Sequence, residues 1–290
     1  MKKMTHSHSA FDIYHPLSLE TAVVFASPHS GRDYSASFLH QSILDSHTIR
    51  SSEDAFVDQL ADFVTEFGAP FLCAKVPRAY LDLNRSHDEL DPAVVDGAKT
   101  KGHNARIASG LGVIPRVVSH SRPIYRGKIS MQDAQHRLTT YWHPYHDALQ
   151  RLMDQAVQKF GYALLVDLHS MPHDAVASPS KFVEPTQIVL GDRFGASCDK
   201  DLGDHVYDSL VHAGFRVGRN SPFAGAFITH HYGRPSQRYH AIQIEIDRGL
   251  YLHESEITLS DGFPETREKL RVALERIATY CADQSKLAAE

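Results

Sequence analysis

Two histidines follow apolar runs that have the character of buried strands. The stretch "LLVDLHSMPH" covers residues 164–173 and contains His169, and the stretch "AVVFASPHSG" covers residues 22–31 and contains His29. In an open parallel sheet, ligands bind outside the carboxyl ends of the strands. A catalytic zinc ion takes three protein ligands from His, Asp or Glu and keeps one position open for water. The two histidines therefore predict one metal site that both imidazoles share.

The third ligand is expected to be a carboxylate at the start of the segment "SSEDAFVD". Glu53 and Asp54 both lie there. An acidic residue at a helix start also acts as a cap or stabilises the helix dipole, so the residues alone leave the choice and the role open. Asp167 lies two residues before His169, and a ligating histidine usually donates its other N–H to a carboxylate. We expect Asp167 to orient His169.

A general base is predicted near the end of the segment "HAIQIEIDRGLY", residues 240–251. Isoleucines alternate there with polar residues, which include Glu245. A carboxylate that is buried at a strand end has a pKa raised toward neutrality, where proton transfer is most effective. The alternative is a half-exposed strand whose polar face is solvated.

Asn84 and Arg85 are candidates for binding an anion. They follow the strand-like stretch "AYLDL". An arginine binds a carboxylate through two parallel hydrogen bonds, and a neighbouring amide can add a third. The alternative is a pair of surface residues in a turn.

Arg137 is a second substrate-binding candidate. With Tyr141 and Tyr145 it places polar groups on one helix face at a spacing of four residues. The alternative is a helix with an aromatic stripe that packs into the core.

The order of predicted elements indicates an α/β protein with a mixed, largely parallel sheet flanked by helices. Strand-like segments cover residues 22–27, 70–76, 79–84, 163–167, 186–192, 215–220, 225–233 and 240–247. Helical patterns cover residues 51–68, 130–160, 197–214 and 264–281, and Pro144 could interrupt the second of these. The segment 86–128 is expected to form long loops or a lid. Because the sequence shows no internal repeats and no linkers, we interpret residues 1–290 as one domain.

Composition is that of an ordinary globular protein. The chain has 42% hydrophobic and 22% charged residues and a formal net charge of −5. This charge gives no reason to expect nucleic acid as a partner, and no apolar run predicts a membrane span. The three cysteines are widely spaced, which argues against a disulfide framework and favours a cytoplasmic protein. The sequence does not indicate an oligomeric state.

Eight motifs together resemble the N-formylglutamate amidohydrolase family, over residues 14–275. They appear in the order "SPHSG", "EDAFVDQL", "PRAYLDLNR", "YWHPYHDAL", "LLVDLHSM", "IVLGDRFG", "PFAGAFITHHYGRP" and "IQIEIDRGLYL". The resemblance implies a zinc-peptidase architecture, of the phosphorylase/hydrolase-like kind, around one Zn²⁺ ion. It also implies hydrolysis of an N-formyl or similar N-acyl amino acid, and N-formyl-L-glutamate is the expected substrate.

Matched to the family's motifs, His29 and His169 correspond to metal ligands, and the resemblance favours Asp54 over Glu53. The family's version "TDWHVDRL" has Trp-His where this chain has Ala-Phe at residues 55–56. Glu245 corresponds to the general base.

The pair Asn84-Arg85 resembles the carboxylate-binding pair of zinc carboxypeptidases. In the implied reaction, Arg234 is expected to help stabilise the oxyanion. The alternatives are a deacylase or carboxypeptidase-like hydrolase with another N-acyl or peptide substrate, and a non-catalytic module that binds a small acid.

Overall fold

The computed structural model of the chain describes residues 10–99, 102, 104–177 and 184–287. Within these residues a mixed sheet of seven strands has the order β1-β3-β2-β6-β9-β7-β8. Four neighbouring pairs are parallel, and β1–β3 and β9–β7 are antiparallel. This confirms the expected fold class. The strands are β1 (Phe11–Tyr14), β2 (Val23–Ser27), β3 (Phe71–Ala74), β6 (Ala163–Met171), β7 (Ile188–Gly191), β8 (Val217–Arg219) and β9 (Tyr239–Asp247).

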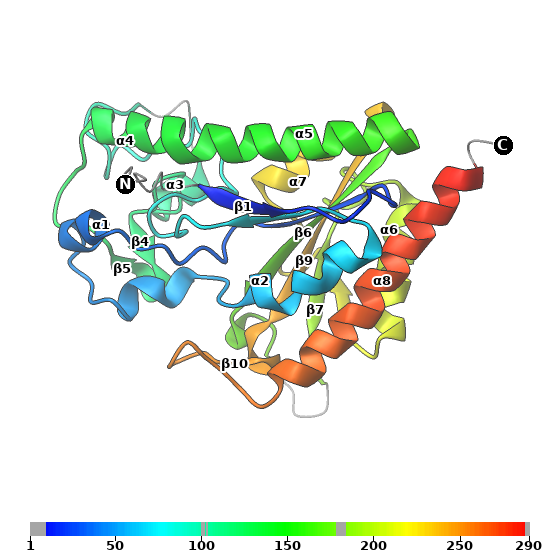
Figure 1. The fold of residues 1–290 in the computed structure, drawn as a ribbon. Helices are drawn as coiled ribbons and strands as arrows, with labels where there is room; N and C mark the ends of the chain where they lie inside the picture. The colour runs from blue at the N-terminus through cyan, green and yellow to red at the C-terminus, as the bar shows by residue number, and fades with distance from the viewer. Residues whose placement is uncertain (1–9, 100–101, 103, 178–183, 288–290) are drawn as a thin grey trace, which may run out of the picture.

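Helices cover both faces of the sheet (Figure 1). On one face lie α5 (His143–Phe160) and α7 (Phe227–Tyr232), and on the other lie α2 (Val57–Leu60), α6 (Lys200–His212) and α8 (Phe263–Leu287). Successive residues of a strand alternate between the two hydrophobic cores. Phe25 and Val166 pack toward α8, whereas Val24 and Leu165 pack toward α5. Among the described residues, no helix combines the length and apolarity that crossing a bilayer requires.

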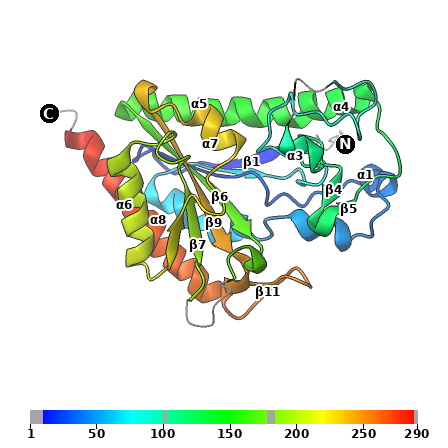
Figure 2. The same cartoon turned by 180° about the vertical axis from the view of Figure 1, so that it is seen from behind.

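Most of the rest of the described chain is irregular, with a few short helices and strands. They are α1 (Ala36–Gln41), α3 (Ala105–Ala108), α4 (Met131–Arg137), β4 (Val117–Val118), β5 (Arg122–Pro123), β10 (Leu252–His253) and β11 (Thr258–Leu259). The described residues of segment 86–128 are largely irregular, as predicted, and the elements α3, β4 and β5 gather near α1 at one end of the molecule (Figure 2). Residues 100, 101 and 103 lie outside the described residues, and closure of this segment as a lid remains a prediction.

The predicted helix over residues 51–68 is wrong as a continuous element. The chain forms a 3₁₀ turn at Thr48–Ser52, the single turn α2, and a second 3₁₀ segment at Asp62–Phe67. Phe56, just before α2, has a φ of 63°, in the left-handed region. The break lets the backbone N–H of Asp54 donate to the carbonyl oxygen of His29 at 3.0 Å. A tertiary contact therefore overrides the helical spacing of the apolar residues.

Two predicted strands are also wrong. Residues 79–84 form turns, because the carboxylate of Asp82 accepts a hydrogen bond from the backbone N–H of Asn84 at 2.8 Å. Residues 225–233 contain the helix α7, where the side-chain oxygen of Asn84 accepts from the backbone N–H of Ile228 at 2.8 Å. Pro144 does not interrupt the predicted helix 130–160. It lies in the first turn of α5, where proline is tolerated, and a π-helical turn at Leu138–Trp142 joins α4 to α5.

Candidate active site

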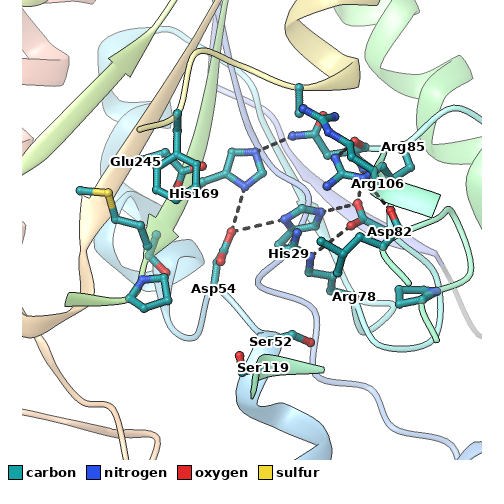
Figure 3. Close-up of a pocket in the computed structure, with 18 of the residues that line it drawn as sticks. His29, Ser52, Asp54, Arg78, Asp82, Arg85, Arg106, Ser119, His169 and Glu245 are labelled. Atoms are coloured by element: carbon teal, nitrogen blue, oxygen red, sulfur yellow. Dashed lines mark hydrogen bonds and ion pairs between the residues drawn. The ribbon is translucent and has the colours of Figure 1, made fainter. Parts of the chain in front are cut away.

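A cavity of about 530 Å³ lies at the carboxyl ends of the central parallel strands. His29 follows β2, and His169 and Glu245 lie near the ends of β6 and β9. The rest of the lining includes residues from the turns at 78–85 and from segment 106–121, which contains parts of the short elements α3 and β4. The size and the mixture of polar and apolar walls suit a small molecule. Figure 3 shows the polar side chains that converge there.

His29, Asp54 and His169 come together as the sequence predicts. One ligand atom from each lies within 4.8 Å of the other two, so the three side chains could hold a metal ion. The Nδ1 atoms of His29 and His169 lie 3.4 and 2.8 Å from Oδ2 of Asp54. None of the three side chains is more than 3% exposed. Two imidazoles and a carboxylate match the donor set of catalytic zinc sites.

The other nitrogen of each ring contacts a second carboxylate. Nε2 of His29 lies 2.7 Å from Asp82, and Nε2 of His169 lies 2.9 Å from Asp167. These contacts orient both Nδ1 atoms toward Asp54, which is the arrangement that proteins use around ligating histidines. Nδ1 of His29 is buried and has no hydrogen-bond partner among the described residues. A metal ion would satisfy this nitrogen, so the residues present fit the ion.

Glu53 and Asp54 have different surroundings. Arg50 donates to Glu53 from two nitrogens, both at 3.0 Å, which holds that carboxylate away from the histidines. Oδ1 of Asp54 instead accepts from Arg248 at 3.0 Å. Burial alone would raise the pKa of Asp54, but the His169 and His29 rings hold this pKa well below its usual value. Asp54 is therefore the ionised carboxylate that faces both imidazoles.

The turn that carries His29 depends on a close approach of two chain segments. Ser27 and Ser30 share a hydrogen bond of 2.9 Å across the turn. At Gly31 a Cβ atom would lie 2.2 Å from the carbonyl oxygen of Val76, a contact that only glycine avoids. The sequence "SPHSG" therefore fixes the chain on both sides of His29.

Glu245 lies beside the metal-ligand candidates. In the parallel pairing of β6 and β9 it is the register partner of His169, and its side chain lines the cavity. Gln243 donates to Oε1 of Glu245 at 2.5 Å. Burial raises the pKa of Glu245, and the charge of Asp54 adds to this effect. A carboxylate with a raised pKa at this position can take up and return a proton.

Asn84 and Arg85 both line the cavity. Helix α5 and the π-helical turn before it fix the backbone around these residues. Trp142, in the turn, donates to the carbonyl oxygen of Arg85, and His146, in α5, lies against that of Leu83, both at 2.9 Å. Nδ2 of Asn84 lies 3.1 Å from Nε2 of His169. The two candidate substrate-binding residues are thus held next to a candidate metal ligand.

Arg137 and Arg234 do not reach the cavity. The guanidinium of Arg137 is fully buried between α4 and the turn at Tyr80, where it pairs with Asp133 at 2.8 Å. Arg234 lies at the start of β9, the opposite end of this strand from Glu245, with its guanidinium 4.8 Å from the centre of the Tyr239 ring. Neither arginine is among the residues that line the cavity.

Four charged residues of the cavity lining were not selected from the sequence, namely Arg78, Asp82, Arg106 and Arg248. Arg78 lies 3.1 Å from Asp82, which also contacts His29, and Arg248 donates to Asp54. Arg248 follows β9 within "EIDRGL", so its place after a strand was a usable signal. Asp82 lies within the predicted strand 79–84 and Arg78 lies just before it, between two predicted strands, so neither position is marked as a strand end.

Comparison with known proteins agrees with this geometry. The family model for N-formylglutamate amidohydrolase matches residues 21–252. The chain belongs to the N-formylglutamate amidohydrolase family. The resemblance of the eight sequence motifs is therefore confirmed.

Relatives in this family cover most of the chain. An N-formylglutamate deformylase from Pseudomonas putida is 30% identical over 241 residues, which is 81% of this chain and 83% of the relative. An enzyme of the same name from Pseudomonas aeruginosa PAO1 is 31% identical and covers 78% of this chain and 82% of its own length. The crystal structure of an N-formylglutamate amidohydrolase from Ralstonia eutropha JMP134 superposes with a TM-score of 0.87 at 34% identity, covering 94% and 98% of the two chains.

Proposed function

We propose that this protein is a metal-dependent amidohydrolase that converts an N-formyl amino acid, N-formyl-L-glutamate, to the free amino acid and formate. The observation that carries the proposal is the convergence of His29, His169 and Asp54 beside the buried carboxylate of Glu245. Membership of the amidohydrolase family supports the amide bond as the site of cleavage.

His29, Asp54 and His169 would hold one ion, and zinc suits a set of two imidazoles and one carboxylate. When bound, such an ion polarises a carbonyl group and lowers the pKa of water. Asp82 and Asp167 would keep the two rings oriented, because each contacts the ring nitrogen that faces away from Asp54.

Glu245 is the general base in this proposal. Its carboxylate takes a proton from the attacking water and then gives it to the amine nitrogen that leaves. Arg78 replaces Arg234 as the group that stabilises negative charge on the carbonyl oxygen. Arg78 lines the same cavity as Glu245 and pairs with Asp82, which contacts the ring of His29, so its guanidinium is available beside the reacting groups.

Asn84 and Arg85 would hold the α-carboxylate of the substrate. Arg85 uses Nε and one terminal nitrogen to donate to the carbonyl oxygens of Leu111 and Asn84, at 3.0 and 2.8 Å. These bonds fix the guanidinium plane and leave N–H groups for a ligand. Holding the α-carboxylate there orients the scissile amide toward Glu245.

A panel of matched substrates tests the function. Release of free glutamate by zinc-loaded enzyme is measured with N-formyl-L-glutamate, N-acetyl-L-glutamate and a dipeptide that ends in glutamate, and formate release is measured with the first. The proposal expects the formyl compound to have the highest kcat/KM and the Glu245→Gln variant to be nearly inactive. A higher kcat/KM for the acetyl compound or the dipeptide would instead identify a deacylase or a carboxypeptidase-like enzyme. Absence of turnover with all three would contradict the proposal.

A further inference from the structure

We propose that Arg106 binds the side-chain carboxylate of the substrate, so that the cavity selects an N-formyl amino acid with a second negative charge. This inference rests on the proposed function and adds the residue that reads the side chain. The role was not assigned to Arg106 from the sequence.

The charges around the cavity leave two cations without a carboxylate partner. Four arginines line it: Arg78, Arg85, Arg106 and Arg248. Arg78 pairs with Asp82 at 3.1 Å, and Arg248 pairs with Asp54 at 3.0 Å. Among the described residues, no carboxylate lies within ion-pair distance of Arg85 or Arg106. A ligand with two carboxylates would supply the two missing anions.

Arg85 and Arg106 also repel one another. Burial lowers the pKa of Arg85, the charge of Asp82 opposes this effect in part, and the charges of Arg78 and Arg106 add to it. Arginine nevertheless remains protonated in proteins, so the cavity holds a cation that is only 6% exposed and, in the described part of the chain, forms no ion pair. Bound anions relieve this desolvation and repulsion, which favours occupancy by negatively charged ligands.

The two arginines differ in how they are held, and this difference separates their roles. Arg85 is buried, and its guanidinium donates to two backbone carbonyls, which suits the α-carboxylate that all amino acids share. Arg106 is exposed, and only its backbone is fixed. Its N–H donates to the side chain of Asn104 at 2.9 Å, and the neighbouring Ile107 is 8% exposed. A long side chain on an anchored backbone suits the variable part of a substrate.

The position of Arg106 agrees with this role. In Figure 3, Glu245 lies on one side of His169, and Arg106 lies with Arg85 on the other side. A substrate whose amide faces Glu245 and whose α-carboxylate meets Arg85 would direct its side chain along this second side. Within the described lining there is no lysine and no further unpaired arginine to meet a second carboxylate.

The experiment compares N-formyl-L-glutamate with N-formyl-L-glutamine, which has nearly the same shape without the charge. Steady-state kinetics are measured for the wild type, Arg106→Met and the control Arg151→Met, which removes an exposed arginine from α5, outside the cavity. A hydrogen bond between charged groups contributes enough to change affinity by about 10- to 100-fold. The wild type and the control should therefore prefer glutamate by about this factor. Arg106→Met should lose the preference, mainly through a higher KM for N-formyl-L-glutamate. Its kcat/KM for N-formyl-L-glutamine should change by less than about threefold.

Binding is measured separately from turnover. Calorimetry of both substrates with the Glu245→Gln variant should show the same preference, and adding Arg106→Met should remove it. The inference would be overturned if Arg106→Met lost kcat/KM equally for both substrates, or if the wild type did not discriminate between them. In either case, formate release by the wild type would still uphold the proposed function. If neither substrate releases formate with the wild type, the proposed function fails, and the inference fails with it.

Discussion

The two walls of the cavity are built by different means. His29, His169 and Glu245 come from the ends of parallel strands, where backbone pairing fixes their relative positions. Arg78 and Arg85 come from turns. The side chain of Arg78 is held by nearby Asp82, and the backbone of Arg85 is held by the distant side chain of Trp142. The comparison indicates a division of labour, in which the sheet positions the groups that do chemistry and the turns carry the cations that recognise charge.

The walls are nevertheless coupled through two contacts. Asp82, on the turn wall, contacts the ring of His29, and Asn84 contacts the ring of His169. A change in the turns is therefore expected to reach the metal-ligand candidates. The variants below test how far the two walls act separately.

The largest effect is expected on the strand wall, from Glu245→Gln. Loss of a general base lowers kcat by roughly 100- to 10,000-fold, and the metal content should not change because Glu245 is not a ligand in this account. Burial raises the pKa of Glu245 above its ordinary value of 4.5. Since the base acts when deprotonated, kcat/KM of the wild type should fall as the pH drops through this raised pKa. A variant with near wild-type kcat would show that another group is the base.

A smaller effect is expected where the turn wall supports the strand wall. Asp82→Asn weakens the contact with Nε2 of His29 and the ion pair with Arg78. Loss of such a supporting carboxylate typically lowers metal affinity by about 10- to 100-fold. Competition with a chelator measures the affinity. Asp88→Asn, at an exposed carboxylate in the same region, is the control and should not change it. Unchanged affinity in Asp82→Asn would show that the walls are independent.

A third variant tests how α5 supports the turn wall. His146 is buried between the hydroxyl of Tyr232 and the carbonyl oxygen of Leu83, at 2.9 Å from each. His146→Leu removes both contacts and leaves the carbonyl oxygen of Leu83 without this partner, whereas the hydroxyl of Tyr232 still donates to the backbone carbonyl oxygen of residue 146. The change should lower the free energy of unfolding by about 1–3 kcal/mol. Urea denaturation measures this change, and exposed His143→Leu is the control. We also expect a higher KM, because Asn84 follows Leu83.

The same histidine has a pH signature. Burial lowers the pKa of His146 from 6.5 to about 3, so the unfolded chain binds its proton first as the pH falls. Its contribution to stability should be present above about pH 6.5 and be lost progressively toward pH 3. His146→Leu should lack this part of the pH dependence of the free energy of unfolding. A pH profile identical to that of the wild type would contradict its assignment to His146.

The smallest effect is expected from Arg234→Met. This arginine lies at the opposite end of β9 from Glu245 and outside the cavity. We expect kcat/KM within about twofold of the wild type, because this half-buried side chain lies outside the cavity and changes away from a functional site usually have small effects on it. A loss of more than tenfold at unchanged metal content would restore Arg234 to the mechanism.

The sequence predicted the strand wall better than the turn wall, for a physical reason. His29 and His169 follow apolar runs, and Glu245 lies in an alternating segment, so local patterns mark all three positions. Local patterns did not separate Asp54 from Glu53. That choice depended on the resemblance, and the structure distinguishes the two by their partners, Arg50 and the histidines.

The turn wall was predicted poorly because its shape depends on contacts between distant residues. Leu81 and Leu83 are both buried and alternate with polar residues, which imitates a strand. The chain instead turns around Asp82, whose partners include His29, 53 residues away in sequence. The helix α7 was missed for the same reason, since Asn84, 144 residues away, accepts the N–H of Ile228.

The most direct test is a zinc titration of metal-free enzyme, with formate release from N-formyl-L-glutamate as the readout. The account predicts no activity without metal and a linear rise that ends at one zinc ion per chain. It also predicts that His169→Ala binds no zinc at the same concentrations. Full activity in metal-free protein, or unchanged zinc binding by His169→Ala, would contradict a catalytic metal held by His29, Asp54 and His169.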